Sequence, residues 1–311
     1  MKYWITGLLM LAVLIIGAVY IFIPASVTVA AVTGIRASED AAYRLLSRED
    51  QWQRWWPHEQ ADTASSQLFY NGSGYTISKK MFRSLGVTLR KNGRSYNSTL
   101  ILLPIGRDSF DIEWKAELAT GSMPLHRYRS YRSATELEHD LHELLGTLKS
   151  FLEKPKNVYG VPIIETKVTD SIILMGTLTG TTQPTTAEIY GMVRGLQDLA
   201  NRSNAHTTNY PMLNIDSIGS KIVARVGIPL DREVDVKGTD YVIKRIVLGN
   251  ILISEVRGGP YTSKNARKQV ELYLNDHKRE SPAIPYESLV VDRSAEPDTS
   301  KWVTRIYYPV Y

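Results

Sequence analysis

Residues 225–229 read RVGIP and residues 305–309 read RIYYP, so one short motif recurs at an offset of 80 residues. Each copy closes a segment with the same order of local patterns. Repetition at a fixed offset predicts two similar units that bury their apolar faces together. The seam between two such units is concave, and concave surfaces are where small molecules bind. The repeat therefore predicts a two-lobed domain with a binding groove at its seam.

Local patterns give both copies the same order of strand, helix, strand and strand. The first copy has strands at 172–178, 212–215 and 222–228, and a helix that Thr185 and Glu188 begin with a capping box. The second copy has strands at 246–256, 286–291 and 302–310, and a helix at 262–278. This order predicts an α+β fold in which strands and helices share one core.

Composition limits the class of protein. The 311 residues exceed the length of most single domains, which predicts two domains. A hydrophobic content of 43% is enough for packed cores. The chain has no cysteine, which excludes disulfides, thiolate catalysis and cysteine-ligated metals. The formal net charge of +5 is compatible with an acidic partner or an anionic membrane surface.

The densest basic cluster alternates with aromatic residues. It consists of Arg127, Tyr128, Arg129, Tyr131 and Arg132. Nucleic-acid binding is one interpretation of such a cluster. The alternation favours a second interpretation, in which residues 126–131 form a strand with one solvated face. Since no helix-turn-helix pattern is present, nucleic acid is not predicted as a partner.

A segment without charge lies near the N-terminus. Residues 4–23 are 20 consecutive uncharged residues, which as a helix measure about 30 Å and match the hydrocarbon thickness of a bilayer. A cleaved signal peptide is the alternative, because Lys2 precedes the run and small residues follow it. The length of the uncharged run favours an uncleaved anchor, which comprises residues 1–25. Lys2, the one charge before Arg36, places the N-terminus in the cytoplasm and the bulk of the chain in the periplasm or on the outer face of the membrane.

Residues 26–154 follow the order strand, two short helices, antiparallel strands and long helix. Ser38 is the predicted N-cap of the first short helix. Strands are predicted at 27–35, 75–81, 87–90, 98–103, 110–116 and 126–131. A leucine stripe after a capping box at Ser133 and Glu136 predicts the long helix, which ends near residue 153.

This order, together with the tryptophan-rich WQRWWP at residues 52–57, resembles the START/polyketide-cyclase (SRPBCC) superfamily over about residues 26–155. The resemblance implies a helix-grip fold, in which an antiparallel sheet curls around a long C-terminal helix and encloses an apolar cavity. The tryptophans are interpreted as core that holds the short helices to the sheet, with ligand contact as the alternative. A polar stretch containing Pro155 and Gly160 then separates this domain from the next.

Three motifs in the second half resemble the GyrI-like small-molecule-binding family, which includes effector-binding domains of AraC-type and multidrug-responsive transcription factors. They are GGPY at residues 258–261, Tyr286-Glu287 at the start of a strand, and RIYYPV at residues 305–310. The resemblance covers residues 158–311. It implies a two-lobed α+β domain whose groove binds cationic or amphipathic small molecules over an acidic floor, the position of Glu287. The aromatic residue often found two positions later is Leu289 here, which alters the expected pocket.

Glu287 is the candidate ligand-binding acid. An acid among apolar neighbours is either turned to solvent or paired with something specific. The resemblance favours the second, because a desolvated carboxylate attracts an organic cation and aromatic walls add cation–π attraction. The aromatic residues placed around the repeat seam are the candidate walls: Tyr190, Tyr261, Trp302 and Tyr308.

Catalysis and metal binding are the competing interpretations. Some members of the GyrI-like family resemble hydrolases, so a small-molecule hydrolase or cyclase with Glu287 as general base is the alternative function. An interaction module in an envelope complex is a third. His139 and Glu143 have zinc-ligand spacing but lie off the leucine stripe, so no metal is predicted, and no cofactor fingerprint is present. The sequence thus predicts a membrane-anchored protein that binds hydrophobic or cationic small molecules without transforming them.

Overall fold

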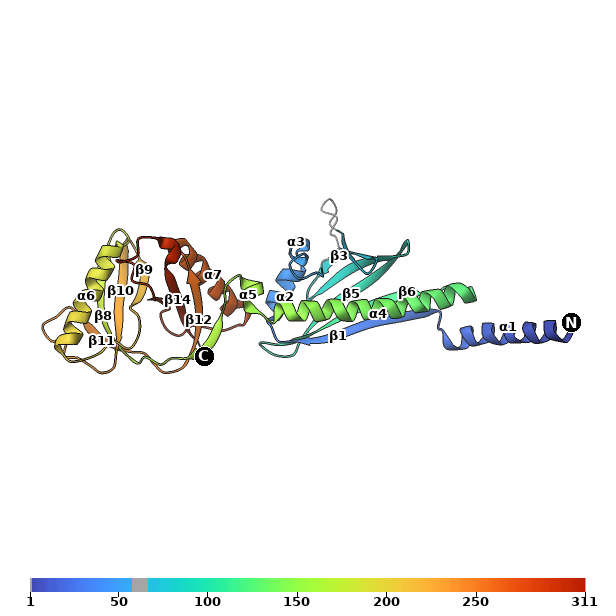
Figure 1. Ribbon diagram of the computed structural model, residues 1–311, viewed down its shortest axis with the longest axis horizontal. Helices are drawn as coiled ribbons and strands as arrows, with labels where there is room; N and C mark the ends of the chain where they lie inside the picture. The colour runs from blue at the N-terminus through green and yellow to red at the C-terminus, as the bar shows by residue number, and fades with distance from the viewer. Residues whose placement is uncertain (1, 58–66, 311) are drawn as a thin grey trace. The chain divides into compact units, whose positions relative to one another are not determined.

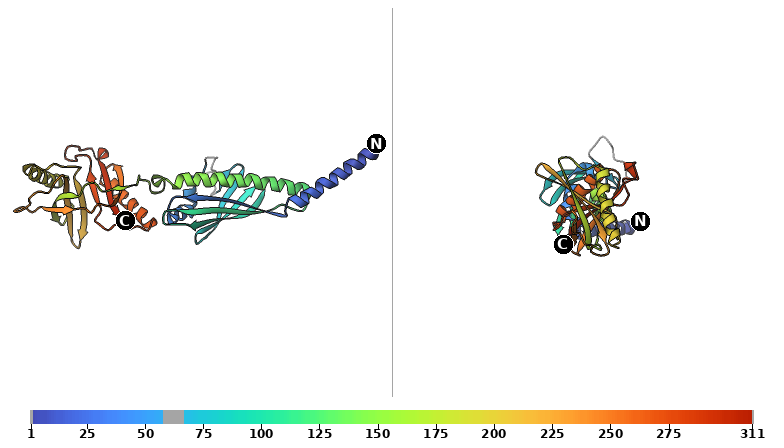
Figure 2. Two further views of the ribbon diagram at one scale, coloured as in Figure 1. Left: turned by 90° about the horizontal axis from the view of Figure 1, so that it is seen from below. Right: turned by 90° about the vertical axis from the view of Figure 1, so that its left-hand side faces the viewer.

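A computed structural model describes residues 2–57 and 67–310 of the chain (Figure 1). The chain divides into a first unit, Met1–Lys154, and a second unit, Pro155–Tyr311. Each unit has its own antiparallel sheet, seen from two further sides in Figure 2. Because helices and antiparallel strands share each core, the fold is α+β.

The N-terminal helix α1 (Lys2–Phe22) is apolar along its length. Among the described residues it is the one helix that is long and apolar enough to cross a membrane, and its hydrophobic window is not buried by protein. Near its C-terminal end it contacts the rest of the first unit. The Tyr20 hydroxyl donates to the Ser122 carbonyl, and the Arg127 guanidinium lies 5.0 Å from the centre of the Tyr20 ring.

The first unit is built on a six-stranded sheet in the order β1-β6-β5-β4-β3-β2. The elements are β1 (Ser26–Ile35), α2 (Glu39–Leu46), α3 (Glu49–Trp52), β2 (Leu68–Tyr70), β3 (Ser73–Met81), β4 (Ser84–Lys91), β5 (Arg94–Pro104), β6 (Phe110–Ala119) and α4 (Pro124–Leu152). Burial alternates along β5 and β6, so Leu100, Ile112 and Trp114 face the core. Helix α4 packs against β1 and β6 on that same side (Figure 1).

Helix α4 begins earlier than the sequence predicted, and the predicted strand at 126–131 is wrong. Pro124 lies in the first helical turn, where its missing N–H is not needed and its fixed φ suits a helix. Basic and aromatic residues in alternation fit a strand face, but they also populate the exposed side of a helix. The helix runs through Ser133, so the Ser133–Glu136 pattern starts nothing.

Tryptophans fill the core side of the first sheet. Trp52 stacks on Trp56 with ring centroids 5.5 Å apart, and Trp114 meets Trp52 edge-on at 6.2 Å. Trp55 and Tyr75 complete the cluster, and all five rings are buried. The helix around the motif ends at Trp52, and a turn brings in the other two indoles. The burial of these rings agrees with the interpretation of the tryptophans as core.

The second unit has an eight-stranded sheet in the order β11-β8-β10-β9-β13-β14-β12-β7. Its elements are α5 (Pro155–Tyr159), β7 (Ile164–Lys167), β8 (Ile172–Gly180), α6 (Thr186–Arg202), β9 (Met212–Ile218), β10 (Lys221–Leu230), β11 (Val242–Arg245), β12 (Asn250–Arg257), α7 (Pro260–Asp276), β13 (Tyr286–Leu289), a 3₁₀ turn (Thr299–Lys301) and β14 (Val303–Val310). The order is symmetric about its centre. The lobe β8-α6-β9-β10 therefore repeats as β12-α7-β13-β14.

Several boundaries in the second unit differ from the predicted ones. The predicted strand at 246–256 starts at Asn250, because residues 246–249 form an extended link in which Val247 is 86% exposed. The short edge strands β7 and β11 were not predicted, since each has only four residues and no buried face. The capping box at Thr185 and Glu188 is present as predicted.

The two long helices of the second unit, α6 and α7, cover the same face of the sheet. Leu289 of β13 lies in one core cluster with Leu196 of α6. Tyr308 of β14 points the same way and its hydroxyl donates to Glu271 of α7. The register places Glu287 opposite Ile306, so Glu287 and Tyr308 share this face. We call it the helix-covered face.

Candidate functional site

Glu287 lies at the centre of the repeat. β13 pairs with β9 and β14, and Glu287 stands opposite Leu213 on one side and Ile306 on the other. Val226, the equivalent of Ile306 in the first lobe, stands opposite Leu213. Leu213 and Glu287 are therefore equivalent positions of the two lobes, and they face each other across the seam.

The Glu287 carboxylate is largely buried and has no protein partner. No residue within 2–57 or 67–310 gives it a hydrogen bond or an ion pair. Burial raises the pKa of Glu287, and the positive charges of Arg267 and Arg293 oppose that rise only in part. Buried carboxylates in proteins are normally paired or hydrogen-bonded. An unpaired one at a seam can accept a cation or a hydrogen-bond donor from outside the chain.

Two arginines that the sequence analysis did not single out lie near this acid. Arg293 donates to the Thr304 hydroxyl at 2.7 Å, and its guanidinium lies 4.8 Å from the centre of the Trp302 ring. Burial lowers the pKa of Arg293, and the charge of Glu287 opposes that effect. The buried Nε atoms of Arg267 and Arg293 have no hydrogen-bond partner among the described residues. No local pattern in the sequence marks either arginine, because only the strand and helix packing brings them to Glu287.

Three of the four predicted aromatic walls lie on the same side of the sheet as Glu287. The Tyr190 hydroxyl donates to the Val291 carbonyl and accepts from the Arg293 amide at 2.9 Å. The Trp302 indole donates to a carbonyl, and the Tyr308 hydroxyl donates to the Glu271 carboxylate at 2.7 Å. Burial raises the pKa of both tyrosines. Because their polar atoms are bound within the protein, their rings are held in fixed positions.

Tyr261 does not join this group. It lies in the first turn of α7 and is 85% exposed. The GGPY motif that drew attention to it serves the backbone, since Gly258 has a φ of 137° and Pro260 starts the helix. The structure therefore brings together Glu287, Tyr190, Trp302 and Tyr308, and leaves Tyr261 in solvent.

The other face of the sheet, which we call the helix-free face, is hollowed. A cavity of about 320 Å³ is lined by Met175, Met212, Arg225, Tyr286 and others, and an adjoining one of about 220 Å³ shares Met212 and Tyr286. Tyr286 stacks on Tyr307 with ring centroids 4.8 Å apart. These side chains point away from Glu287, since successive residues of a strand face opposite sides.

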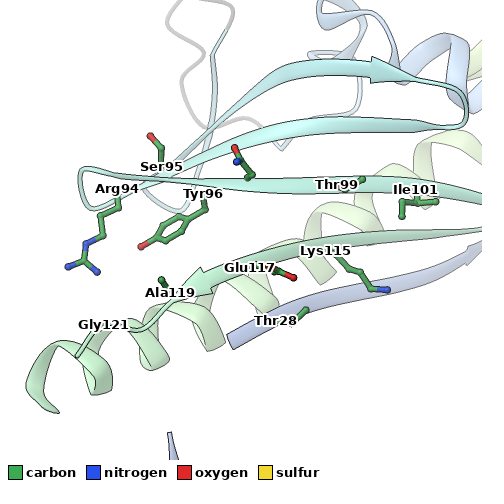
Figure 3. A pocket seen from close by; sticks show the side chains of 11 residues that line it. Thr28, Arg94, Ser95, Tyr96, Thr99, Ile101, Lys115, Glu117, Ala119 and Gly121 are labelled. Atoms are coloured by element: carbon green, nitrogen blue, oxygen red, sulfur yellow. The ribbon is translucent and has the colours of Figure 1, made fainter. Parts of the chain in front are cut away.

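The first unit has a trough of about 1010 Å³ on the outer face of its sheet (Figure 3). Strands β1, β5 and β6 line it, with Lys115 and Glu117 along its length and Arg94 and Tyr96 toward the end where Gly121 lies. Most of the residues that line it are polar, and its floor and walls also expose apolar atoms. The trough is on the side of the sheet away from the tryptophan core.

The structure forms no metal site in its described residues. No group of three or more candidate ligands is present within residues 2–57 and 67–310. His139 and Glu143 form an exposed pair at 3.4 Å on α4. Two exposed side chains on one helix form a surface contact, and they are too few to coordinate a metal ion.

Comparison with known proteins gives fold likenesses of low identity. No family model and no curated protein matches the chain. The EcmrR C-terminal domain is 13% identical over 49% of this chain and 98% of that one, with a TM-score of 0.42. SAV2435 bound to tetraphenylphosphonium is 13% identical over 48% and 93%, with a TM-score of 0.34. A hydrolase from Listeria innocua is 8% identical over 47% and 91%, with a TM-score of 0.36. The function is therefore argued from this chain's own residues.

Proposed function

We propose that the protein is a membrane-anchored, GyrI-like binding protein for hydrophobic or cationic small molecules, and that Glu287 on the helix-covered face contacts the ligand. The unpartnered, largely buried Glu287 carboxylate is the observation that supports this proposal most directly. A carboxylate held out of water gains from any cation or strong donor that reaches it.

The surroundings of Glu287 favour an organic cation over a metal ion. Besides the two arginines, Tyr190, Trp302 and Tyr308 lie on this side of the sheet, and aromatic ring faces attract organic cations by cation–π contact. Arg293 already uses the Trp302 ring in this way at 4.8 Å. A bound organic cation pairs with the Glu287 carboxylate. Arg293 does not compete for that position, because its guanidinium is hydrogen-bonded to the Thr304 hydroxyl.

The anchor belongs to the same proposal. Helix α1 is exposed along its hydrophobic window, and such a surface is stable only in an apolar environment. Tyr3 and Trp4 at one end and Tyr20 at the other match the aromatic residues that flank membrane spans. The remainder of the chain, which includes a helix-grip first unit, then lies on the outer side of the membrane.

Titration calorimetry on the full chain in nanodiscs tests the binding site. The probes are tetraphenylphosphonium, a bulky cation, and triphenylphosphine oxide, its neutral counterpart. We expect Glu287→Gln to weaken binding of the cation about tenfold, which corresponds to roughly 1.4 kcal/mol, and to change binding of the neutral probe little.

Two control variants keep the test specific. Glu280→Gln changes an exposed acid of the same unit, and Met175→Trp fills the cavity on the helix-free face. Both should bind the cation as the wild type does. The assignment to Glu287 is wrong if the wild type and Glu287→Gln bind the cation equally well. It is also wrong if only Met175→Trp loses binding.

A hydrolase or cyclase is the second candidate, favoured by the raised pKa of Glu287, since a general base needs such a pKa to work near neutral pH. Tyr190 and Tyr308 donate their hydroxyl protons to other protein groups, so neither is placed to assist. Turnover of a panel of esters and epoxides that is lost in Glu287→Gln and kept in Glu280→Gln would establish catalysis.

A further inference from the structure

The first turns of α4 expose an unusual mixture of side chains. Met123, Leu125 and Tyr128 are 63%, 60% and 52% exposed. Arg127 and Arg129 lie among them. Apolar residues of this size, exposed together beside arginines, are typical of surfaces that contact a membrane interface.

This surface lies level with the end of α1. The Tyr20 hydroxyl donates to the Ser122 carbonyl, and Arg127 covers the Tyr20 ring. The backbone and side chain of Thr120 donate to the carbonyls of Ala25 and Pro24. Residues 120–127 are therefore held against residues 20–25, and the figures show the start of α4 beside the end of α1 from two sides (Figures 1 and 2).

Resting on the proposed anchor, we infer that the start of α4, residues 123–129, is a second membrane contact that binds anionic lipid headgroups. When α1 spans a bilayer, Tyr20 lies in the interfacial layer, because tyrosine near the end of a span prefers that depth. The contacts of Tyr20 place Arg127 at the same depth. Met123 and Leu125 then reach the acyl chains, and the arginines reach the phosphates.

The charge balance of this surface favours an anion. Arg127 is partly exposed and Arg129 is exposed, so both side chains can offer positive charge to a lipid phosphate at that depth. Arg94 lies close by, bonded through one nitrogen to the Ser130 hydroxyl. The acids nearby are Glu136, which pairs with Arg132 at 3.3 Å, and Glu117 in the trough. Basic residues near an anionic membrane surface are attracted over about a Debye length.

Site-directed spin labelling of the full chain tests this inference. The chain has no cysteine, so a single introduced cysteine carries the label. Leu125→Cys reports the proposed contact, Leu9→Cys reports the middle of α1, and Ile105→Cys reports an exposed turn before β6. The protein is placed in vesicles of phosphatidylcholine with or without phosphatidylglycerol, and the accessibility of each label to oxygen and to a water-soluble nickel reagent is measured.

We expect the Leu125 label to lose nickel accessibility in the vesicles with phosphatidylglycerol, while the Ile105 label stays fully accessible. Adding Arg127→Gln and Arg129→Gln should restore nickel access at position 125, and adding Arg127→Lys and Arg129→Lys should not. A label at position 125 that is as accessible as the one at 105 overturns the contact. Equal protection in both kinds of vesicle overturns the assignment to anionic lipid.

Failure of the anchor gives a different result. In that case the nickel reagent reaches the Leu9 label. This result would contradict both the membrane span of α1 and the α4 contact that depends on it. A lipid-exposed label at position 9 with a water-exposed label at 125 removes the α4 contact alone. Circular dichroism of each variant confirms that the fold is kept.

Discussion

At the scale of residues, the carboxyl group of Glu287 makes the stability of the second unit depend on pH. Burial raises the pKa of Glu287 above its ordinary value of 4.5. Between 4.5 and the raised value, the folded state binds more protons than the unfolded state. This contribution to stability is therefore fully present below about pH 4.5 and is lost as the pH rises through the raised pKa.

The first prediction follows from that sign. We expect Glu287→Gln to gain stability relative to the wild type as the pH rises above about 4.5, because glutamine has no charge to desolvate. The positive charges of Arg267 and Arg293 favour the ionised form of Glu287 in the wild type, which reduces the size of this gain. Urea denaturation at a series of pH values measures the difference, with Glu280→Gln as the control. A pH-independent difference would contradict the prediction.

A second residue-scale prediction concerns the hydroxyl of Tyr308. It donates to Glu271 at 2.7 Å from a ring that is 3% exposed. Tyr308→Phe should lower the free energy of unfolding by about 1 kcal/mol, the usual net value of one such bond. Tyr261→Phe is the matched control and should change nothing, since Tyr261 is exposed. Equal stability of the two variants would show that the bond contributes nothing in solution.

At the scale of elements, the order of strands and helices could be predicted because burial alternates with the right period in most of them. The basic and aromatic run at the start of α4 was misassigned, because its alternation fits a strand while the helix leaves most of these residues exposed, without the apolar period of a buried helix. β7 and β11 escaped for a similar reason, because neither has a buried face. Pro124 was the one local cue for the true helix start.

Prediction of the site followed the same division. Glu287 was proposed as a site residue from a motif, and Tyr190, Trp302 and Tyr308 were proposed from their positions near the repeat seam. Arg267 and Arg293 were not found, because they reach Glu287 from a helix and a loop through packing alone. Tyr261 was grouped with the others by sequence closeness to a motif, and its place in the first turn of α7 leaves it in water.

The long helix gives the third prediction. Leu144 of α4 is fully buried against the first sheet. Leu144→Ala should lower the free energy of unfolding of the first unit by about 3 kcal/mol, because it removes apolar contacts and leaves a cavity. The exposed neighbour His142→Ala should cost little. Thermal unfolding of the two variants compares them, and similar midpoints would argue against close packing at this position.

At the scale of the whole molecule, each unit has a sheet and a core of its own. Domains of this kind generally unfold as separate cooperative units. We expect Leu144→Ala to lower one calorimetric transition, and Val226→Ala, in the core of the second unit, to lower the other by roughly 2 kcal/mol. If either variant shifts both transitions together, the two cores are energetically coupled.

Leu213 and Glu287 stand opposite each other at the centre of the second sheet, which breaks the symmetry of the duplicated halves. Two carboxylates at these directly opposed, partly buried positions would repel each other. The two lobes avoid this repulsion, because the acid in one meets a neutral, oily side chain in the other. The midline of this domain is lopsided as a result, with one ionisable group where strict twofold symmetry would have placed two.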